Sequence, residues 1–595
     1  MSAKVISLKI PPGIQRDGTI FDAPTYVDGK WVRFQRGRPR KIGGYKGIFQ
    51  NATNISRGMI ISSQNGLSYV YSGYNAGLQY WSTDNDDGVG SGPYPITISS
   101  GFTANANNLW QFDIGYDSNG GGADTIIAHP GQNLEDIDST VNTPVLYGTF
   151  PGGNLSPVGQ FTASVALTNG TNTGVITGVN GLVYPGQLVI GAGFIAGTTV
   201  TQALVSGGNT DLTFSNNYTG TTGTETLTFD NQINVSGGCC IIYPYLFVYG
   251  NNGLIQNSSA GDFQNWVAAD ANANNVATGK IVKGLPVRGG TTSPSGLFWS
   301  LDSLVRVSYT PTTVGTGTTT STTYWRYDLI SCQSSLLSSS SIIEYDGIYY
   351  WCGVDRFLMY NGVVQELANT QNMNYFFDNL NYAERQKVWV SKVPRWGEIW
   401  WFYPSGTSTE CNNAIIYNVR EKVWYDAGFA LGARRSAGTF SEVFRFPIWA
   451  GNELNGSNTT LWQHESGVNQ VNLNEQNAIQ SYFETNNLGW VTGGPMGSTQ
   501  TAVGANNWIR IERVEPDFVQ SGSMNLYITG KGYADDVDVT SSPYPFDPTT
   551  LKVDMREQRR ELRMRFESNI VNGNYETGNI LISAEIGDVR STGNP

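Results

Sequence analysis

Residues that support common enzyme chemistry are scarce in this chain of 595 residues, which has only two histidines, His129 and His464. A Ser-His-Asp or Cys-His arrangement needs a histidine positioned by a carboxylate. His129 precedes Pro130 in an expected turn, and His464 follows an aromatic strand, so we expect both to be surface or turn residues. The chain also lacks a phosphate-binding loop, a Gly-x-Ser-x-Gly elbow and a dinucleotide fingerprint. We therefore predict no catalytic, cofactor or metal site, and no enzyme activity.

Cysteines and long apolar runs are equally sparse. The five cysteines are Cys239, Cys240, Cys332, Cys352 and Cys411. Their odd number and low density imply no disulfide framework, and no Cys-x-x-Cys pair exists. The first residues lack the apolar core of a signal peptide, and no run approaches the length of a membrane span. We expect a protein made in a cytoplasm that does not cross a bilayer as a single helix.

Charged residues make up only 14% of the chain, with a net charge of −12 and a pI of about 4.8. Such a chain has no general electrostatic hold on DNA, because phosphate binding needs clustered Lys and Arg. The acidity fits simple solubility, and it also fits a surface past which nucleic acid slides without adhering. Composition does not separate these two interpretations.

Glycine, by contrast, reaches 71 residues, aromatics 12% and hydrophobic residues 39%. This mixture is typical of many short strands joined by tight turns, so we predict an all-β fold. Few helices are expected, and the clearest candidate is Asn372 to about Asn379, with a second turn near Ala383 to Lys387.

A glycine turn followed by a short aromatic strand recurs along the chain. Its centres, Phe247, Phe298, Tyr349, Trp400 and Trp449, are spaced by 51, 51, 51 and 49 residues. A period near fifty residues is typical of a four-stranded propeller blade, and turns such as Asn361-Gly362 supply the hairpins within each blade.

Two earlier centres, Ile126 and Tyr69 to Tyr71, complete the series if about 70 residues are removed between Ile126 and Phe247. The segment from Phe161 to Phe229 has this length and contains only Asp211 and Glu225 as charged residues. We predict that it is a small β-domain inserted into a propeller loop. Seven centres predict about seven blades, with six or eight as alternatives.

After about residue 475 the aromatic period gives way to longer strands of alternating apolar and polar residues, such as Trp508 to Val514 and Glu561 to Phe566. Strict alternation indicates strands with one buried face, so we predict a β-sandwich-like platform. The predicted divisions are an N-terminal arm or platform segment (1–55), the first part of the propeller (56–160), the inserted domain (161–229), the second part of the propeller (230–475) and the C-terminal platform (476–595).

One basic cluster lies near the N-terminus, between the turns at Asp28-Gly29 and Gly43-Gly44. Its candidate interface residues are Lys30, Arg33, Arg36, Arg38, Arg40 and Lys41, with Lys46 just beyond them. In an acidic chain such a cluster fits a docking surface for another acidic subunit or for phosphate. A solvated arm or strand face is the alternative. A second, mixed cluster in the C-terminal module comprises Arg556, Arg559, Arg560, Arg563 and Arg565 beside glutamates.

The acidic loop from Asp84 to Gly88 resembles part of a calcium loop but lacks the distal glutamate, so a solvated turn is favoured. A carboxylate pair for glycoside hydrolysis could be assembled across blades, and no spacing excludes it. The aromatic residues could likewise stack on sugars, although their repeat positions favour core packing.

These segments together resemble the packaged-DNA stabilisation proteins, also called tail hub or nozzle proteins, of short-tailed bacteriophages. The resemblance is strongest from about Cys239 onwards. The segments that carry it are Tyr249–Gly253, Gly261–Trp266, Asp355–Gly362, Ile415–Asn418, Val423–Asp426 and Arg563–Phe566. In the predicted insertion, Ala192–Thr201 and Leu212–Ser215 resemble small β-modules of phage tail and fibre proteins.

The resemblance implies a structural protein of the virion tail that forms a homo-hexameric ring beneath the portal and adaptor. Implied partners are the adaptor, tail fibres, spikes or needle, and genomic double-stranded DNA that passes through the ring axis without specific binding. No cofactor is implied. The alternatives are a phage tail propeller that acts as a lectin or polysaccharide depolymerase, and a soluble propeller scaffold unrelated to virions.

Overall fold

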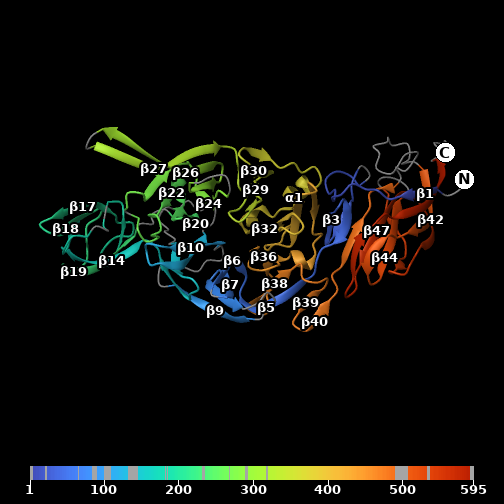
Figure 1. Cartoon of the computed structure of the whole chain (residues 1–595), viewed down its shortest axis with the longest axis horizontal. Coiled ribbons are helices and arrows are strands. Elements are labelled where there is room, and N and C mark those ends of the chain that lie inside the picture. Colours follow the sequence, from blue (N-terminus) through green and yellow to red (C-terminus); the bar gives the residue numbers. More distant parts are fainter. Residues whose placement is uncertain are drawn as a thin grey trace.

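The computed structural model of the chain describes residues 4–20, 23–64, 66–83, 90–98, 109–131, 145–180, 183, 185–230, 235–266, 268–288, 293–316, 319–488, 507–531 and 536–589. Within these residues nearly every regular element is a β-strand. One α-helix, α1 (Met373–Asn379), and three short 3-10 segments, η1 (Asn251–Gly253), η2 (Tyr382–Lys387) and η3 (Leu431–Ala433), accompany them. The all-β prediction is confirmed. The molecule is elongated, with a propeller in the middle, a small β-domain at one end and a sandwich at the other (Figure 1).

The propeller consists of seven blades of four antiparallel strands each, and the first two blades are joined into one eight-stranded sheet by parallel pairing of their fourth strands. Blades one to three contain β6 (Ser56–Gln64), β7 (Leu67–Tyr74), β8 (Gly77–Thr83) and β9 (Gly90–Ile98); β10 (Leu109–Asp117), β11 (Ala123–Gly131), β12 (Leu146–Thr149) and β13 (Asn154–Pro157); and β20 (Gly238–Ile242), β21 (Tyr245–Tyr249), β22 (Leu254–Asn257) and β23 (Asn272–Asn275). Blades four and five contain β24 (Ile281–Pro286), β25 (Ser295–Ser300), β26 (Leu304–Thr316) and β27 (Thr319–Ser331); and β28 (Ile342–Tyr345), β29 (Ile348–Cys352), β30 (Phe357–Tyr360) and β31 (Val364–Glu366). Blades six and seven contain β32 (Trp389–Val393), β33 (Glu398–Tyr403), β34 (Asn413–Asn418) and β35 (Val423–Asp426); and β36 (Arg435–Thr439), β37 (Ile448–Gly451), β38 (Asn458–His464) and β5 (Tyr45–Thr53).

The first strands of the blades form a ring. The strands β6, β10, β20 and β24 contact one another in that order, as do β28, β32, β36 and again β6. Blades four and five are joined by a shared apolar cluster and by the Tyr349 hydroxyl, which donates to the carbonyl of Pro286 at 2.6 Å. The seven repeat centres of the sequence, six of them aromatic and the seventh Ile126, all lie in the second strands of the blades, from β7 to β37. The period near fifty residues is therefore the blade repeat.

The strand β5 lies in blade seven, although residues 45–53 fall in the segment 1–55 that the sequence assigned to the N-terminal arm. It pairs with β38, from Asn458 opposite Thr53 to His464 opposite Tyr45. Residues 435–464 supply only three strands of this blade, so a strand from before blade one completes it and closes the ring. A hairpin of β39 (Gln470–Asn472) and β40 (Glu475–Asn477) extends the same sheet.

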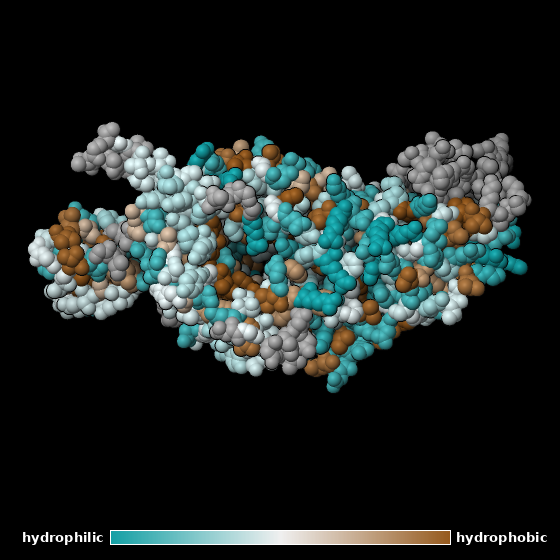
Figure 2. All heavy atoms as spheres, in the orientation of Figure 1, coloured by the Kyte–Doolittle hydropathy of each residue, from teal (hydrophilic) through white to brown (hydrophobic). Residues whose placement is uncertain are grey.

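The small β-domain leaves the propeller between blades two and three. Its six-stranded sheet comprises β14 (Gln160–Leu167), β15 (Thr173–Ile176), β16 (Leu188–Ile190), β17 (Val200–Ser206), β18 (Asn209–Phe214) and β19 (Gly223–Asp230). The first and last strands pair along their whole length, with Phe161 opposite Phe229 and their rings stacked at 5.3 Å. The domain has its own apolar core. Apolar side chains are also exposed on it, including Ile195 and Val205, and hydrophobic patches mark this end of the molecule in Figure 2.

The sandwich at the opposite end contains both ends of the described chain (Figure 1). Its larger sheet has nine strands: β1 (Lys4–Ser7), β2 (Asp28–Lys30), β41 (Ser481–Glu484), β42 (Asn507–Glu515), β44 (Met524–Lys531), β45 (Val539–Thr540), β46 (Tyr544–Phe546), β47 (Val553–Ser568) and β49 (Leu581–Val589). Its smaller sheet has four: β3 (Val32–Gln35), β4 (Arg38–Lys41), β43 (Phe518–Ser521) and β48 (Asn574–Thr577).

One continuous core joins the sandwich to the propeller. The buried cluster that includes Phe483 and Phe566 of the sandwich also includes Trp400 and Trp449 of blades six and seven. The fully buried indole of Trp31 lies between them, with its ring centroid 5.8 Å from that of Trp400. Since buried aromatic side chains contribute large apolar areas, this core fixes the sandwich rigidly to one side of the propeller.

Candidate functional site

The six candidate interface cations do not share one exposed surface. Arg36 and Arg38 are exposed at the turn between β3 and β4. Arg36 has a φ of 54° and precedes Gly37 with a φ of 70°, the positive pair that a two-residue hairpin turn requires. Arg40 is half-buried and donates to Glu576 at 2.9 Å. Only the tip of this hairpin therefore presents positive charge to solvent.

Lys30 and Lys41 are occupied within the sandwich. Lys30 is half-buried, and its ammonium donates to Gln480 Oε1 at 3.0 Å. Lys41 is buried and donates to the carbonyl of Gly573 at 2.7 Å. Burial lowers the pKa of Lys41 to about 8. Neither ammonium is placed to meet a neighbouring subunit.

Arg33 is fully buried where the sandwich meets the propeller. Its guanidinium donates to both oxygens of Glu398 in β33, at 2.8 and 3.0 Å, and to both oxygens of Glu465 after β38, at 2.7 and 2.6 Å. Burial alone would lower the pKa of Arg33, but the two carboxylates raise it above its usual value. Trp396 lies 4.7 Å from this guanidinium and donates to Glu465. Arg33 thus connects two blades to the sandwich and is not a docking residue.

Both histidines are buried, which corrects the expectation of surface or turn positions. His464 ends β38 inside an aromatic cluster, 4.0 Å from Trp449 and stacked on Tyr45 at 5.2 Å. Its Nε2 accepts a hydrogen bond from Arg435 Nε at 2.9 Å. Burial, together with the charge of Arg435, lowers the pKa of His464 well below its usual 6.5. The neutral ring serves as an aromatic core residue. In the sequence, the charged Glu465 next to it indicated an exposed position instead.

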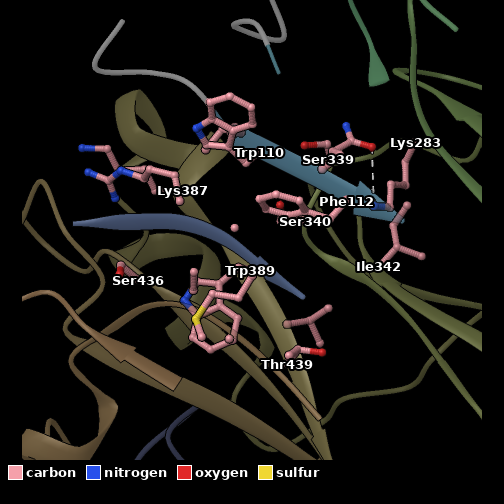
Figure 3. A pocket seen from close by; sticks show the side chains of 18 of the residues that line it. Trp110, Phe112, Lys283, Ser339, Ser340, Ile342, Lys387, Trp389, Ser436 and Thr439 are labelled. Atoms are coloured by element: carbon pink, nitrogen blue, oxygen red, sulfur yellow. Dashed lines mark hydrogen bonds between the residues drawn. The ribbon is translucent and has the colours of Figure 1, made fainter. Parts of the chain in front are cut away.

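The axial channel of the propeller contains two chambers. The first chamber, of about 230 Å³, is lined by side chains from β6, β10, β24, β28, β32 and β36 and from the segments just before them. In Figure 3, Lys283 and Ile342 lie on one side of its opening, and Lys387 and Ser436 lie on the other. The second chamber has a volume of about 340 Å³.

The two chambers meet at an apolar waist. Five apolar residues line both chambers, one from each of five blades, and Gly438 and Thr439 of blade seven lie at the same level. The five are Met59, Phe112, Leu285, Ile342 and Val390. Side chains two positions apart on a strand point to the same side, so one first strand can contribute residues to more than one level of the channel. On β24, for example, Lys283 faces the first chamber and Leu285 the waist.

The second chamber carries charges of both signs, including Asp113, Arg288, Glu344 and Lys392. The Glu344 carboxylate lies 3.6 Å from Lys392 and 3.9 Å from Arg288. Asp113 accepts hydrogen bonds from the backbone N–H groups of Ile114 and Ile241. These carboxylates therefore have structural partners.

The sandwich also holds a cavity, of about 570 Å³, beside β2, β44 and β47. Its charged side chains are paired: Arg16 with Asp28 at 2.5 Å, and Arg563, of the second basic cluster, with Glu484 at 3.3 Å and with Asp538. The cluster is thus largely compensated inside the sandwich.

Within the described ranges, no group of three or more His, Cys, Asp or Glu residues is arranged to hold a metal ion. The acidic loop 84–88 lies outside these ranges. No helix in the described part of the chain has both the length and the apolar composition needed to span a bilayer.

The sequence did not single out the channel residues. Lys283, Gln386 and Ser436 lie in or just before the first strands of blades four, six and seven, ahead of the aromatic strands that mark the repeat. The repeat could have identified them. The first strand of a blade lies at the propeller axis and directly precedes the aromatic second strand, so residues just ahead of an aromatic centre are candidates for the channel.

The chain matches no family model and no curated protein. Among solved structures, it is similar to an exported protein from Bacteroides fragilis, with a TM-score of 0.24 and 9% identity over 61% of this chain and 96% of that chain. It is also similar to a glycoside hydrolase (TM-score 0.22, 11% identity, 90% of this chain and 100% of that chain). A third is an exo-β-1,3-galactanase from Phanerochaete chrysosporium, solved with galactose (TM-score 0.24, 10% identity, 91% and 100%). Similarities this low carry no argument about function.

Proposed function

We propose that this chain is a subunit of the tail nozzle of a short-tailed bacteriophage. In this proposal six copies form a ring below the portal and adaptor, retain the packaged DNA and pass it to the host, without enzymatic turnover. The observation that carries the proposal is the serial layout of the molecule: a sandwich with both described chain ends, a propeller, and an inserted β-domain at the opposite end (Figure 1). A subunit placed between other tail components needs two separate docking ends, and this layout provides them.

The channel of one propeller is too small to be the DNA path. Its chambers hold about 230 and 340 Å³, comparable to small-molecule sites, and an apolar waist separates them. The major groove of a DNA duplex alone is about 12 Å wide. In the proposed nozzle the duplex therefore runs along the axis of the ring of copies, past the outer surfaces of the propellers.

The charge distribution supports a passage to which DNA does not adhere. The chain has a net charge of −12, and exposed cations such as Arg326, Arg434 and Arg513 are paired with carboxylates of the same chain. Binding to DNA gains its free energy when clustered cations neutralise phosphates and release counterions. A surface whose cations are already paired gains little in this way, and phosphates slide past it.

Electron microscopy of the purified protein, alone and mixed with the adaptor of the same virus, tests the proposal. We expect sixfold rings with an axial opening wide enough for duplex DNA, at least when the adaptor is present. Binding of a random duplex at physiological salt should be negligible in the same samples. Monomers in both samples would contradict the proposal. Cleavage of host polysaccharide that is lost when a carboxylate pair is replaced would favour the depolymerase instead.

A further inference from the structure

The long hairpin of blade four extends beyond the propeller. Its strands β26 and β27 have 13 residues each, whereas the pairing of β25 with β26 ends at Ser295 opposite Ser308. Past this point the described part of the chain pairs β26 and β27 only with each other, as far as Thr316 opposite Thr319. We call residues 310–323 the arm. It projects at the end of the molecule where the inserted β-domain lies (Figure 1).

The described side chains of the arm are not packed against a core. Residues 310–313 of β26 and Thr322 and Thr323 of β27 are all exposed. Across the arm, the hydroxyls of Thr313 and Thr322 lie 3.0 Å apart. A two-stranded ribbon by itself is at best marginally stable in water, because it has no apolar face to bury. A further strand added to the arm would therefore stabilise it.

Only one of the two edges of the arm is protected against pairing with a further strand. On β26, Pro311 has no backbone N–H to donate, and the register shift between Tyr309 and Thr312 marks a bulge. Both features are typical of edges that do not accept another strand. Residues 319–323 of β27 are all Thr or Ser, without proline or charge. The β27 edge is therefore the open one.

A second open edge lies in the inserted β-domain. Strand β17 is the last of its sheet, and only its beginning is bridged to β16, where Thr199 meets Leu188. From Gln202 to Ser206 the described structure pairs β17 with β18 alone. Leu204 and Val205 point to opposite faces and are 54% and 62% exposed. A strand added here would cover part of both side chains.

The charge pattern favours a second copy of this chain as the partner. The chain has no charged residue between Arg306 and Arg326, and β17 has none either. Two copies with a net charge of −12 each repel one another, so they meet at least cost where neither surface is charged. Pairing of two arms would join threonines only, whereas β17 offers Leu204 and Val205 for burial. Within one chain the two edges belong to separate sheets.

We propose that the β27 edge of the arm of one copy pairs with the β17 edge of a neighbouring copy and extends its sheet by strand addition. Each copy gives one arm and receives another, and heterologous contacts of this kind close into a ring when the rotation between copies fits. The inference rests on the proposed nozzle function, since it names the contact between neighbours in the ring. The free part of β17 is short compared with the roughly 20–30 residues a side of a standard interface, so isolated copies should associate weakly.

Cysteine cross-linking tests which strands meet. Because Cys332 is exposed, every variant also carries Cys332→Ser. Affinity-tagged Thr322→Cys is mixed with untagged Val205→Cys, with and without the adaptor of the same virus, and treated with a short bis-maleimide. We expect cross-linked dimers that contain one chain of each kind. Their yield should fall at least fivefold when Val519→Cys, at an exposed valine of the sandwich, replaces Val205→Cys.

Three results would overturn the proposed contact. The first is the absence of mixed dimers in both samples. The second is that Thr322→Cys forms dimers only with itself, which would mean that arms pair with arms. The third is that Thr322→Cys and Val205→Cys become linked only when one chain carries both, which would mean that the arm folds onto its own inserted domain.

Shortening the arm separates this inference from the nozzle proposal. Replacement of residues 310–323 by an Asn-Gly turn removes a segment whose described side chains are exposed, so the variant should fold. Val205→Lys instead places a charge on the receiving edge. In electron microscopy with the adaptor, each change should reduce the fraction of copies in sixfold rings at least fivefold, whereas Val519→Lys should leave it unchanged.

Rings that form normally from both variants would overturn the arm contact and leave the nozzle proposal standing. Mixed cross-linked dimers from a protein that forms no sixfold rings would support the arm contact and overturn the nozzle proposal. The two failures are therefore distinguishable in the same set of samples.

Discussion

Arg33 is a fully buried cation held by two buried carboxylates, Glu398 and Glu465. Removing the cation leaves both carboxylates in the interior with their mutual repulsion. We expect Arg33→Met to lower the free energy of unfolding by about 3–5 kcal/mol, as for other broken buried ion pairs. Equilibrium urea unfolding, followed by tryptophan fluorescence, measures the change.

Arg38→Met is the matched control for Arg33→Met, because it makes the same substitution at an exposed arginine of the neighbouring strand β4. It should change stability by no more than about 0.5 kcal/mol. The triple variant Arg33→Met, Glu398→Gln, Glu465→Gln should recover part of the loss, since no uncompensated charge then remains. Equal losses for Arg33→Met and Arg38→Met would contradict a role for the buried cluster.

His464 should make stability depend on pH. Its pKa is lowered in the folded protein and about 6.5 in the unfolded chain, so the unfolded state binds more protons below pH 6.5. Stability is therefore complete above pH 6.5 and falls by up to about 1.4 kcal/mol per pH unit as the solution becomes more acidic. His464→Gln keeps an acceptor for Arg435 and should remove this contribution between pH 6.5 and 5. If the stability of the parent protein and that of His464→Gln change with pH in the same way, His464 does not make this contribution.

The sequence could not identify these interior cations, because their partners are remote. Arg33 meets carboxylates 365 and 432 positions away, and Lys41 donates to a carbonyl 532 positions away. Along the chain the same residues form a dense basic run, which is the usual pattern of a solvated surface. Only the packing of segments that lie far apart in the chain shows that Arg33 and Lys41 of this run are internal.

At the scale of elements, the inserted domain is attached by two neighbouring strand ends. Gln160 and Asp230 are cross-strand partners, and the Gln160 amide donates to the Asp230 carboxylate at 2.8 Å. Deleting residues 161–229 and joining the ends with a short glycine linker should leave the thermal midpoint of the remainder within a few degrees. Circular dichroism and calorimetry measure it.

A deletion of blade four, residues 281–331, is the control. It removes one member of the ring, so the remaining blades no longer close and the chain should fail to fold. The isolated segment 160–230 should fold by itself, because it has its own core. Insoluble protein after the first deletion would contradict an independent insertion.

Blades were predictable because their second strands are similar to one another. The centres of these strands are buried on both faces, as β33 illustrates from Glu398 to Tyr403, and so favour aromatic and branched residues at most positions. The first strands vary, because each contributes a different side chain to the channel. The chamber around Lys283 was therefore hidden from the sequence, although the repeat that creates it was evident.

At the scale of the whole molecule, the chain begins and ends its described course in the same sandwich. It runs from β1 through the hairpin of β3 and β4 into β5 and then around the seven blades, with the inserted β-domain between blades two and three. It returns to the sandwich with β41 and β49. The closing strand of the ring and the partner of β1 were not predictable from local patterns. Both are pairings between segments at opposite ends of the sequence, for which a single sequence carries no signal.

The pairing of β1 with β49 has a consequence for synthesis on the ribosome. Lys4 pairs with Ala584, so β1 leaves the exit tunnel long before β49 and waits for that strand before it finds its partner. Long-range pairings of this kind form slowly and late. A polypeptide released early would carry an open sheet edge in place of a finished sandwich. Only a fully translated copy would present the finished surface, so incomplete copies would be excluded from any assembly that docks there.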